Sequence, residues 1–127
     1  LGGARTKAKD ARIQADLSQV RSIAELIASD QPATGYTNLC SGGDLVYTGT
    51  SNNYTSTLAT LRSDISTQMG EAISVGTNFA CYAGSAAYCV SADLKSTGIG
   101  FYCIDYKGNA TTVGAITCAS TTVYCAP

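Results

Sequence analysis

The sequence predicts one α+β domain, with a long amino-terminal helix, a second short helix and a small antiparallel β-sheet. Three observations support this class: apolar residues at helical spacing in the first thirty residues, a second helical pattern that ends at a glycine, and β-forming residues from residue 73 onward. At 127 residues the chain is large enough to bury a core. We expect a single domain over residues 1–127, made of a spine helix over 1–30, a loop region with the second helix over 31–72, and a sheet with a carboxy-terminal loop over 73–127.

The spine helix is predicted from one apolar stripe whose members are spaced alternately four and three residues apart. The stripe consists of Ile13, Leu17, Val20, Ala24 and Ile27. We expect three alanines to widen it towards the start of the helix, namely Ala8, Ala11 and Ala15. The opposite, polar side is expected to carry Arg12, Asp16, Gln19, Arg21 and Glu25. Pro32 ends the pattern, because the residue before a proline disfavours helical geometry. Such a helix, of about 26 residues, is longer than the domain needs, so we expect the rest of the chain to pack on its carboxy-terminal half.

Residues 31–54 are rich in turn-forming residues and indicate a loop, in which the apolar residues 45–47 contact the core. The second helix is predicted over about 55–69, with a Ser or Thr at 55–57 as its N-cap and Gly70 as its stop. Its apolar stripe indicates a core face rather than a cofactor pocket, and consists of Leu58, Leu61, Ile65 and Met69.

The remaining chain has strand character. The brief apolar runs 73–75 and 79–81 indicate an edge strand or loop. A hairpin is predicted from two strands, 88–94 and 99–105, joined by a turn at Lys95-Ser96-Thr97-Gly98, and a second turn at 105–109 leads to a strand over 111–116. This antiparallel β-meander needs one face covered, and the spine helix offers the only long apolar surface.

Composition excludes several function classes. The chain has no His, which removes Ser-His and Cys-His nucleophile pairs, and its carboxylates are scattered, so that Asp93 and Asp105 are expected to cap turns. We expect no enzyme, no catalytic residue and no cofactor. A net charge of −1 gives no electrostatic case for nucleic acid. The first dozen residues hold four cations against one carboxylate, which indicates a solvated or lipid-facing helix start, with a polyanion contact as the alternative.

The chain opens at Leu1 without a signal peptide, so we expect a segment upstream to have been removed.

Six cysteines in a chain of this length indicate an oxidising compartment and three disulfides, because the closely spaced pairs typical of zinc sites are absent. Cys89 and Cys103 lie at nearly equal distances from the 95–98 turn, which favours a bridge between them. Cys118 and Cys125 would close a short carboxy-terminal loop, and Cys40 would then pair with Cys81. Other pairings remain open, with Cys81–Cys103 the main competitor.

The turn Asp105-Tyr106-Lys107-Gly108-Asn109 has two interpretations. A hairpin turn with a left-handed glycine is favoured, and calcium binding through Asp105, Asn109 and carbonyl groups is the alternative. No other metal site is expected. Asn53 and Asn109 begin glycosylation sequons, but three-residue matches are frequent by chance and we expect both to be unmodified. The eight tyrosines are expected to serve packing and interfaces.

Residues 1–12, LGGARTKAKDAR, with the amphipathic run that follows, resemble the segment just after the hydrophobic stem of a type IV pilin or pseudopilin. The order that follows is also similar: a long loop with Cys40, a second helix, YCVSA at 88–92, YCIDYKG at 102–108 and a Cys near the end. The hairpin pattern resembles pilins of ultra-small, episymbiotic bacterial lineages. The strongest family mark is the apolar half-helix with its assembly glutamate, and this sequence does not contain it, so those residues cannot be placed here.

The resemblance implies a pilin-like fold and a structural subunit of an extracellular type IV pilus, used for adhesion, twitching motility or DNA uptake. Its partners would be copies of itself, other pilins and the inner-membrane assembly machinery, with host or surface ligands at 31–54 and 105–125 and membrane contact only through the missing stem. The resemblance also implies that the helix carrying Ile13, Leu17, Val20, Ala24 and Ile27 packs in the filament. A pseudopilin of a type II secretion or competence machine is one alternative. A stand-alone secreted binding module is the second, and it predicts a self-sufficient helix.

Overall fold

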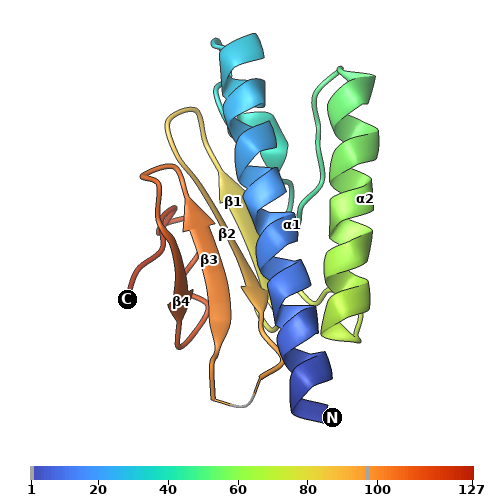
Figure 1. The fold of residues 1–127 in the computed structure, drawn as a ribbon. Coiled ribbons are helices and arrows are strands. Elements are labelled where there is room, and N and C mark those ends of the chain that lie inside the picture. Colours follow the sequence, from blue (N-terminus) through green and yellow to red (C-terminus); the bar gives the residue numbers. More distant parts are fainter. Residues whose placement is uncertain (1, 97) are drawn as a thin grey trace.

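The computed structural model describes residues 2–96 and 98–127. Leu1 lies outside the described residues, and so does Thr97, which belongs to the expected 95–98 turn. The elements follow in the order α1 (Gly2–Asp30), a 3₁₀ turn η1 (Thr37–Leu39), α2 (Asn52–Met69), β1 (Phe79–Ala83), β2 (Tyr88–Asp93), β3 (Phe101–Asp105) and β4 (Ala110–Val113). The strands form one antiparallel sheet in the order β1-β2-β3-β4. The α+β class is therefore confirmed, and Figure 1 shows α1 and α2 side by side against the sheet.

The apolar stripe of α1 faces the domain core. Its five members, Ile13, Leu17, Val20, Ala24 and Ile27, are fully buried. Burial begins at Asp10, ahead of the helix midpoint, so the domain covers more of α1 than its carboxy-terminal half. Residues 3–9 are exposed or half-buried, and the first turns of α1 extend beyond the end of α2 (Figure 1).

Helix α2 begins three residues earlier than the sequence predicts. Ser51 is its N-cap, and the Ser51 carbonyl accepts the backbone N–H of Tyr54 and of Thr55. The Ser and Thr residues at 55–57 therefore lie inside the helix, where the hydroxyls of Thr55 and Thr57 donate to carbonyls four residues back. Gly70 ends the helix in the left-handed conformation, as expected, with its N–H on the carbonyls of Ser66 and Thr67. The predicted stripe of α2 is buried: Leu58, Leu61, Ile65 and Met69.

Both faces of the sheet are covered, whereas the sequence argument required cover on one face only. One face contributes alternate strand residues to the core beneath the helices, including Phe79, Val90 and Ile104. The other face contributes Cys89, Cys103 and Val113 to a second cluster, which the carboxy-terminal segment completes with Cys118 and Cys125. Because it is covered on both sides, β2 is buried at five of its six positions.

The strand boundaries differ from the predicted ones at the loops. Residues 73–75 form no strand, and only Val75 makes an isolated bridge, to Phe79. The loop between β2 and β3 spans 94–100, longer than the expected four-residue turn. Strand β4 ends at Val113, before Gly114, and not at 116. In the 31–51 loop, Leu45 and Tyr47 reach the core as expected, while Val46 points to solvent.

Candidate functional site

The outer face of α1 carries small side chains in a regular row. We call this row the outer stripe; it consists of Ala4, Ala8, Ala11, Ala15, Ser18, Ser22, Leu26 and Ser29, all exposed. At about 100° per residue the row lies roughly opposite the buried stripe. The expectation that Ala8, Ala11 and Ala15 widen the buried stripe is therefore wrong, and the helical angle of each alanine was the signal that would have shown it. Leu26 is the one large apolar residue of the row, 53% exposed.

The outer stripe changes which residues of α1 are available to another subunit. The residues expected to pack in a filament, Ile13 through Ile27 of the buried stripe, have no exposed surface because they cover the domain's own sheet. They cannot also contact a neighbour while the domain stays folded. The outer stripe, in contrast, is exposed along the length of α1.

A shallow groove follows the junction between α1 and α2 beside the outer stripe. Its lining is uncharged: Ser18, Gln19, Ser22 and Ile23 from α1, with Ser56, Thr57, Thr60 and Leu61 from α2. Several hydroxyls donate within their own helix, such as Thr60 to the Ser56 carbonyl at 3.0 Å. The hydroxyls of Ser22 and Thr57 likewise donate to carbonyls four residues back.

Exposed cations occupy the amino-terminal end of α1. Among the described residues, Arg5, Lys7 and Lys9 form no ion pair, and all three are exposed. Asp10, the one carboxylate among the first dozen residues of the sequence, is buried and accepts the backbone N–H groups of Lys95 at 2.5 Å and Ser96 at 3.1 Å. It is thus engaged in anchoring the β2–β3 loop to α1.

A buried carboxyl lies between the two helices, where the sequence suggested an exposed one. Asp16 is 6% exposed, and its Oδ2 has no hydrogen-bond partner among the described residues. Burial, together with a hydrogen bond to Asp64, raises the pKa of Asp16 to about 7. Arg12 pairs with Asp64 at 2.8 Å. The expected polar side of α1 is thus divided between solvent and α2.

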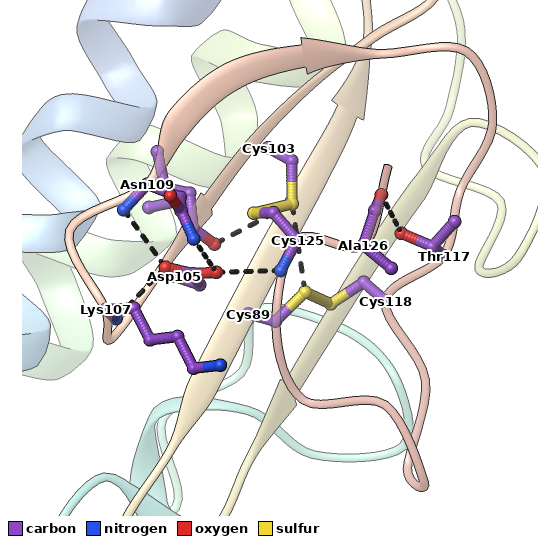
Figure 2. The surroundings of a disulfide bond; sticks show 10 residues. Cys89, Cys103, Asp105, Lys107, Asn109, Thr117, Cys118, Cys125 and Ala126 are labelled. Carbon is purple, nitrogen blue, oxygen red and sulfur yellow. Dashed lines mark hydrogen bonds between the residues drawn. A yellow bond between two sulfur atoms is a disulfide. The ribbon is translucent and has the colours of Figure 1, made fainter.

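The carboxyl of Asp105 organises the turn for which calcium was the alternative. Its Oδ1 accepts the backbone N–H groups of Lys107 and Asn109, and its Oδ2 accepts the Asn109 side-chain amide and the backbone N–H of Cys125 (Figure 2). Asn109 therefore offers Asp105 a donor and not a metal-binding oxygen. Gly108 is left-handed, at φ 88°. This arrangement is the hairpin turn that the sequence favours over calcium binding. Asp93, the second carboxylate of the sheet, pairs with Lys95 at 3.6 Å.

The structure pairs Cys40 with Cys81, the pairing that the sequence favoured, but it pairs Cys89 with Cys118 and Cys103 with Cys125. The favoured bridges Cys89–Cys103 and Cys118–Cys125 are therefore wrong, and so is their competitor Cys81–Cys103. The strand register explains the error: Cys89 lies opposite Asp105 and Cys103 lies opposite Ser91, so the two cysteines are diagonal neighbours. The carboxy-terminal segment crosses this face and supplies a partner to each.

The two regions expected to matter for recognition, residues 31–54 and 105–125, are partly exposed. In the 105–125 region, the Lys107 ammonium lies 4.8 Å from the ring centre of Tyr124 and 5.8 Å from that of Tyr106. The sequon residues differ in setting: Asn53 lies in the first turn of α2, and the amide of Asn109 is engaged by Asp105.

Over residues 2–96 and 98–127, no helix combines the length and the hydropathy that a membrane crossing requires. Comparison with protein-family models, with curated proteins and with solved structures found no significant match.

Proposed function

We propose that the chain is a structural subunit of an extracellular type IV pilus, which polymerises through α1. The observation that carries the proposal is the outer stripe: seven of its eight residues are Ala or Ser, along 29 residues of helix, on the face opposite the core. Small side chains let neighbouring helix backbones approach closely, which gives dense packing in a helical bundle. The order of helix, loop, second helix and meander supports the same family.

The two faces of α1 have separate roles, one in folding and the other in assembly. The buried stripe stabilises the head, and the outer stripe is left for copies of the same chain and for other pilins. A head-to-tail contact that repeats without closing produces a filament. A row of Ala and Ser buries little apolar area per contact, so stable assembly depends on many contacts along the filament. A stem upstream would join the assembly machinery of the inner membrane, as the resemblance implies.

A pseudopilin uses the same surfaces in a short fibre inside the envelope, so the location of the protein separates the two functions. Immunogold electron microscopy of intact source cells, with an antibody raised against the head, tests this directly. Gold along thin surface filaments supports a major pilin, and gold only at filament tips supports a minor one. A signal that appears only after the envelope is opened overturns the pilus proposal in favour of the pseudopilin.

The outer stripe itself is tested by enlarging one alanine in the full-length chain. Ala15→Trp is expected to abolish surface filaments, because a large ring separates helices that must pack closely. Ala59→Trp is the matched control, since Ala59 is an exposed alanine on α2. Both purified heads should unfold at the wild-type temperature. Normal filaments in Ala15→Trp would rule out the outer stripe as the polymerisation surface.

A further inference from the structure

The two carboxy-terminal disulfides lie in contact with each other. Cys89 and Cys103 belong to different bridges, yet their Sγ atoms are 3.9 Å apart in the buried second cluster (Figure 2). The Sγ atoms of Cys89, Cys103 and Cys125 all lie within 4.8 Å of one another, and Cys118 is bonded to the first. Four sulfurs are thus gathered at one point of the sheet.

The strands hold this arrangement in place. Cys89 and Cys103 are on adjacent strands, on the same face, offset by two positions of the register. The Cys40–Cys81 bridge is separate, because Cys81 belongs to the opposite face and packs in the main core. Any exchange among neighbouring sulfurs is therefore confined to the four cysteines of the second cluster.

We infer that these four sulfurs form a thiol–disulfide exchange site, at which a small-molecule thiol converts the two bridges into Cys89–Cys103 and Cys118–Cys125. In this second pairing the carboxy-terminal segment is closed on itself and is no longer bonded to β2 and β3. The conversion is an isomerisation that consumes no oxidant or reductant, since the attacking thiol is regenerated.

The exchange has three steps. The external thiolate attacks Cys125 Sγ, forms a mixed disulfide there, and releases Cys103 as a thiolate. Cys103 then attacks its neighbour Cys89, so that the Cys89–Cys103 bond forms and Cys118 leaves as a thiolate. Cys118 finally attacks Cys125 in the mixed disulfide, forms Cys118–Cys125 and expels the external thiolate.

Burial determines where the thiol enters. Cys125 is 8% exposed and Cys118 is 3% exposed, whereas Cys89 and Cys103 have no exposed surface. The first attack therefore falls on Cys125, at the rim. The second step needs no diffusion, because Cys103 is already in contact with Cys89.

Folding sets the direction of the exchange. The structure closes sequence separations of 29 and 22 residues, whereas the second pairing closes separations of 14 and 7. Shorter loops cost less chain entropy in an unfolded chain. The folded sheet favours the observed bridges in two ways. The carboxy-terminal segment packs in the second cluster, and the backbone N–H of Cys125 donates a hydrogen bond to Asp105. Loosening the fold therefore shifts the population towards the second pairing.

Tryptic mapping separates the two pairings in one measurement. Cleavage after Arg62, Lys95 and Lys107 places Cys103 in peptide 96–107 and both Cys118 and Cys125 in peptide 108–127. In the observed pairing, peptide 108–127 is linked to its neighbours through both bridges. In the second pairing it is released alone with an internal disulfide. The protein is incubated with mixed reduced and oxidised glutathione at pH 8, in increasing urea, quenched with acid and alkylated before digestion.

Released, internally bridged 108–127 is expected only when thiol is present, and its amount should rise with urea below the unfolding midpoint. Loss of the bridges to free thiols, with no released bridged peptide at any urea concentration, would overturn the inference.

Two variants with one free thiol each give a matched comparison. Cys118→Ser leaves Cys89 free beside Cys103, so Cys89–Cys103 should form and free Cys125. Cys40→Ser leaves Cys81 free on the other face, so Cys89–Cys118 and Cys103–Cys125 should persist. Retention of Cys103–Cys125 in folded Cys118→Ser would also contradict the exchange. If that variant does not fold, the glutathione series on the unmodified protein decides.

Discussion

Asp16 of α1 and Asp64 of α2 interact across the junction of the two helices, and the interaction moves their pKa values in opposite directions. Burial is the main cause that raises the pKa of Asp16 to about 7, and the hydrogen bond to Asp64 adds to it. The same hydrogen bond lowers the pKa of Asp64, which Gln68 and Arg12 also contact. Asp16 therefore keeps its proton to a higher pH than Asp64 does.

This pair makes stability depend on pH. The ordinary pKa of 3.8 applies to Asp16 in the unfolded chain, and the folded chain holds the proton up to about pH 7. Stabilisation from this group is therefore complete below about pH 4 and is lost as the pH rises through 7. Asp16→Asn keeps a donor and removes the charge, so it should raise the free energy of unfolding by about 1–2 kcal/mol at pH 8 and by much less at pH 4. Urea unfolding at both pH values measures this.

Asp64→Asn provides the comparison for that measurement. It removes one cause of the raised pKa of Asp16, so the fall in stability between pH 4 and pH 7 should become shallower but remain. An identical stability change at pH 4 and pH 8 in Asp16→Asn would show that Asp16 titrates normally.

Asp105→Asn should destabilise the carboxy-terminal segment. Burial alone would raise the pKa of Asp105, but the four hydrogen bonds that its carboxylate accepts outweigh burial and lower that pKa. Asn has only one accepting oxygen, so the variant should lose about 1–3 kcal/mol at neutral pH. The stabilisation in the natural chain is present above pH 4 and is lost as the pH falls below that value. Thermal unfolding from pH 2.5 to 7 tests both. Calcium or a chelator should leave the melting temperature unchanged.

Gly35→Ala should destabilise the protein far more than Gly42→Ala. Both glycines have positive φ, 58° and 62°, so an alanine costs about 1 kcal/mol at either position. At Gly35 an added Cβ would also meet the Ser85 carbonyl oxygen, whereas at Gly42 it would meet nothing within 4 Å. Denaturant unfolding of the pair isolates the steric contribution. Equal losses in the free energy of unfolding would mean that the backbone near Ser85 moves aside at no measurable cost.

Asp10→Ala should release the β2–β3 loop from α1. It removes the acceptor for the backbone N–H groups of Lys95 and Ser96, which lie 85 and 86 residues away in sequence. We expect a loss of about 1–2 kcal/mol and faster hydrogen exchange at both amides. Exchange that stays as slow as in the natural chain would show that water or another group replaces the carboxylate.

Local pattern was sufficient for the elements of this fold. The spacing of Ile13, Leu17 and Val20 places a helix, and Gly70 stops the second helix, because these signals act through neighbours along the chain. The β-forming residues around Val90 likewise predict the central hairpin. Cysteine content by itself predicts a bridged domain, and the structure holds three disulfides. The opposed placement of Ala11 and Ile13 on α1 was also available from helical geometry.

Only the tertiary structure decided how these elements meet. Cys89 and Cys103 are two register positions apart because Cys89 pairs with Asp105 across β2 and β3, and register is a property of the pair of strands. The carboxy-terminal segment then supplies Cys118 and Cys125 from a distance in sequence at which no local pattern acts. Asp16 is buried for the same reason, since α2 covers it from 48 residues away through Asp64. Sequence patterns report forces between neighbours along the chain, whereas bridge partners and buried charges depend on which distant surfaces pack together.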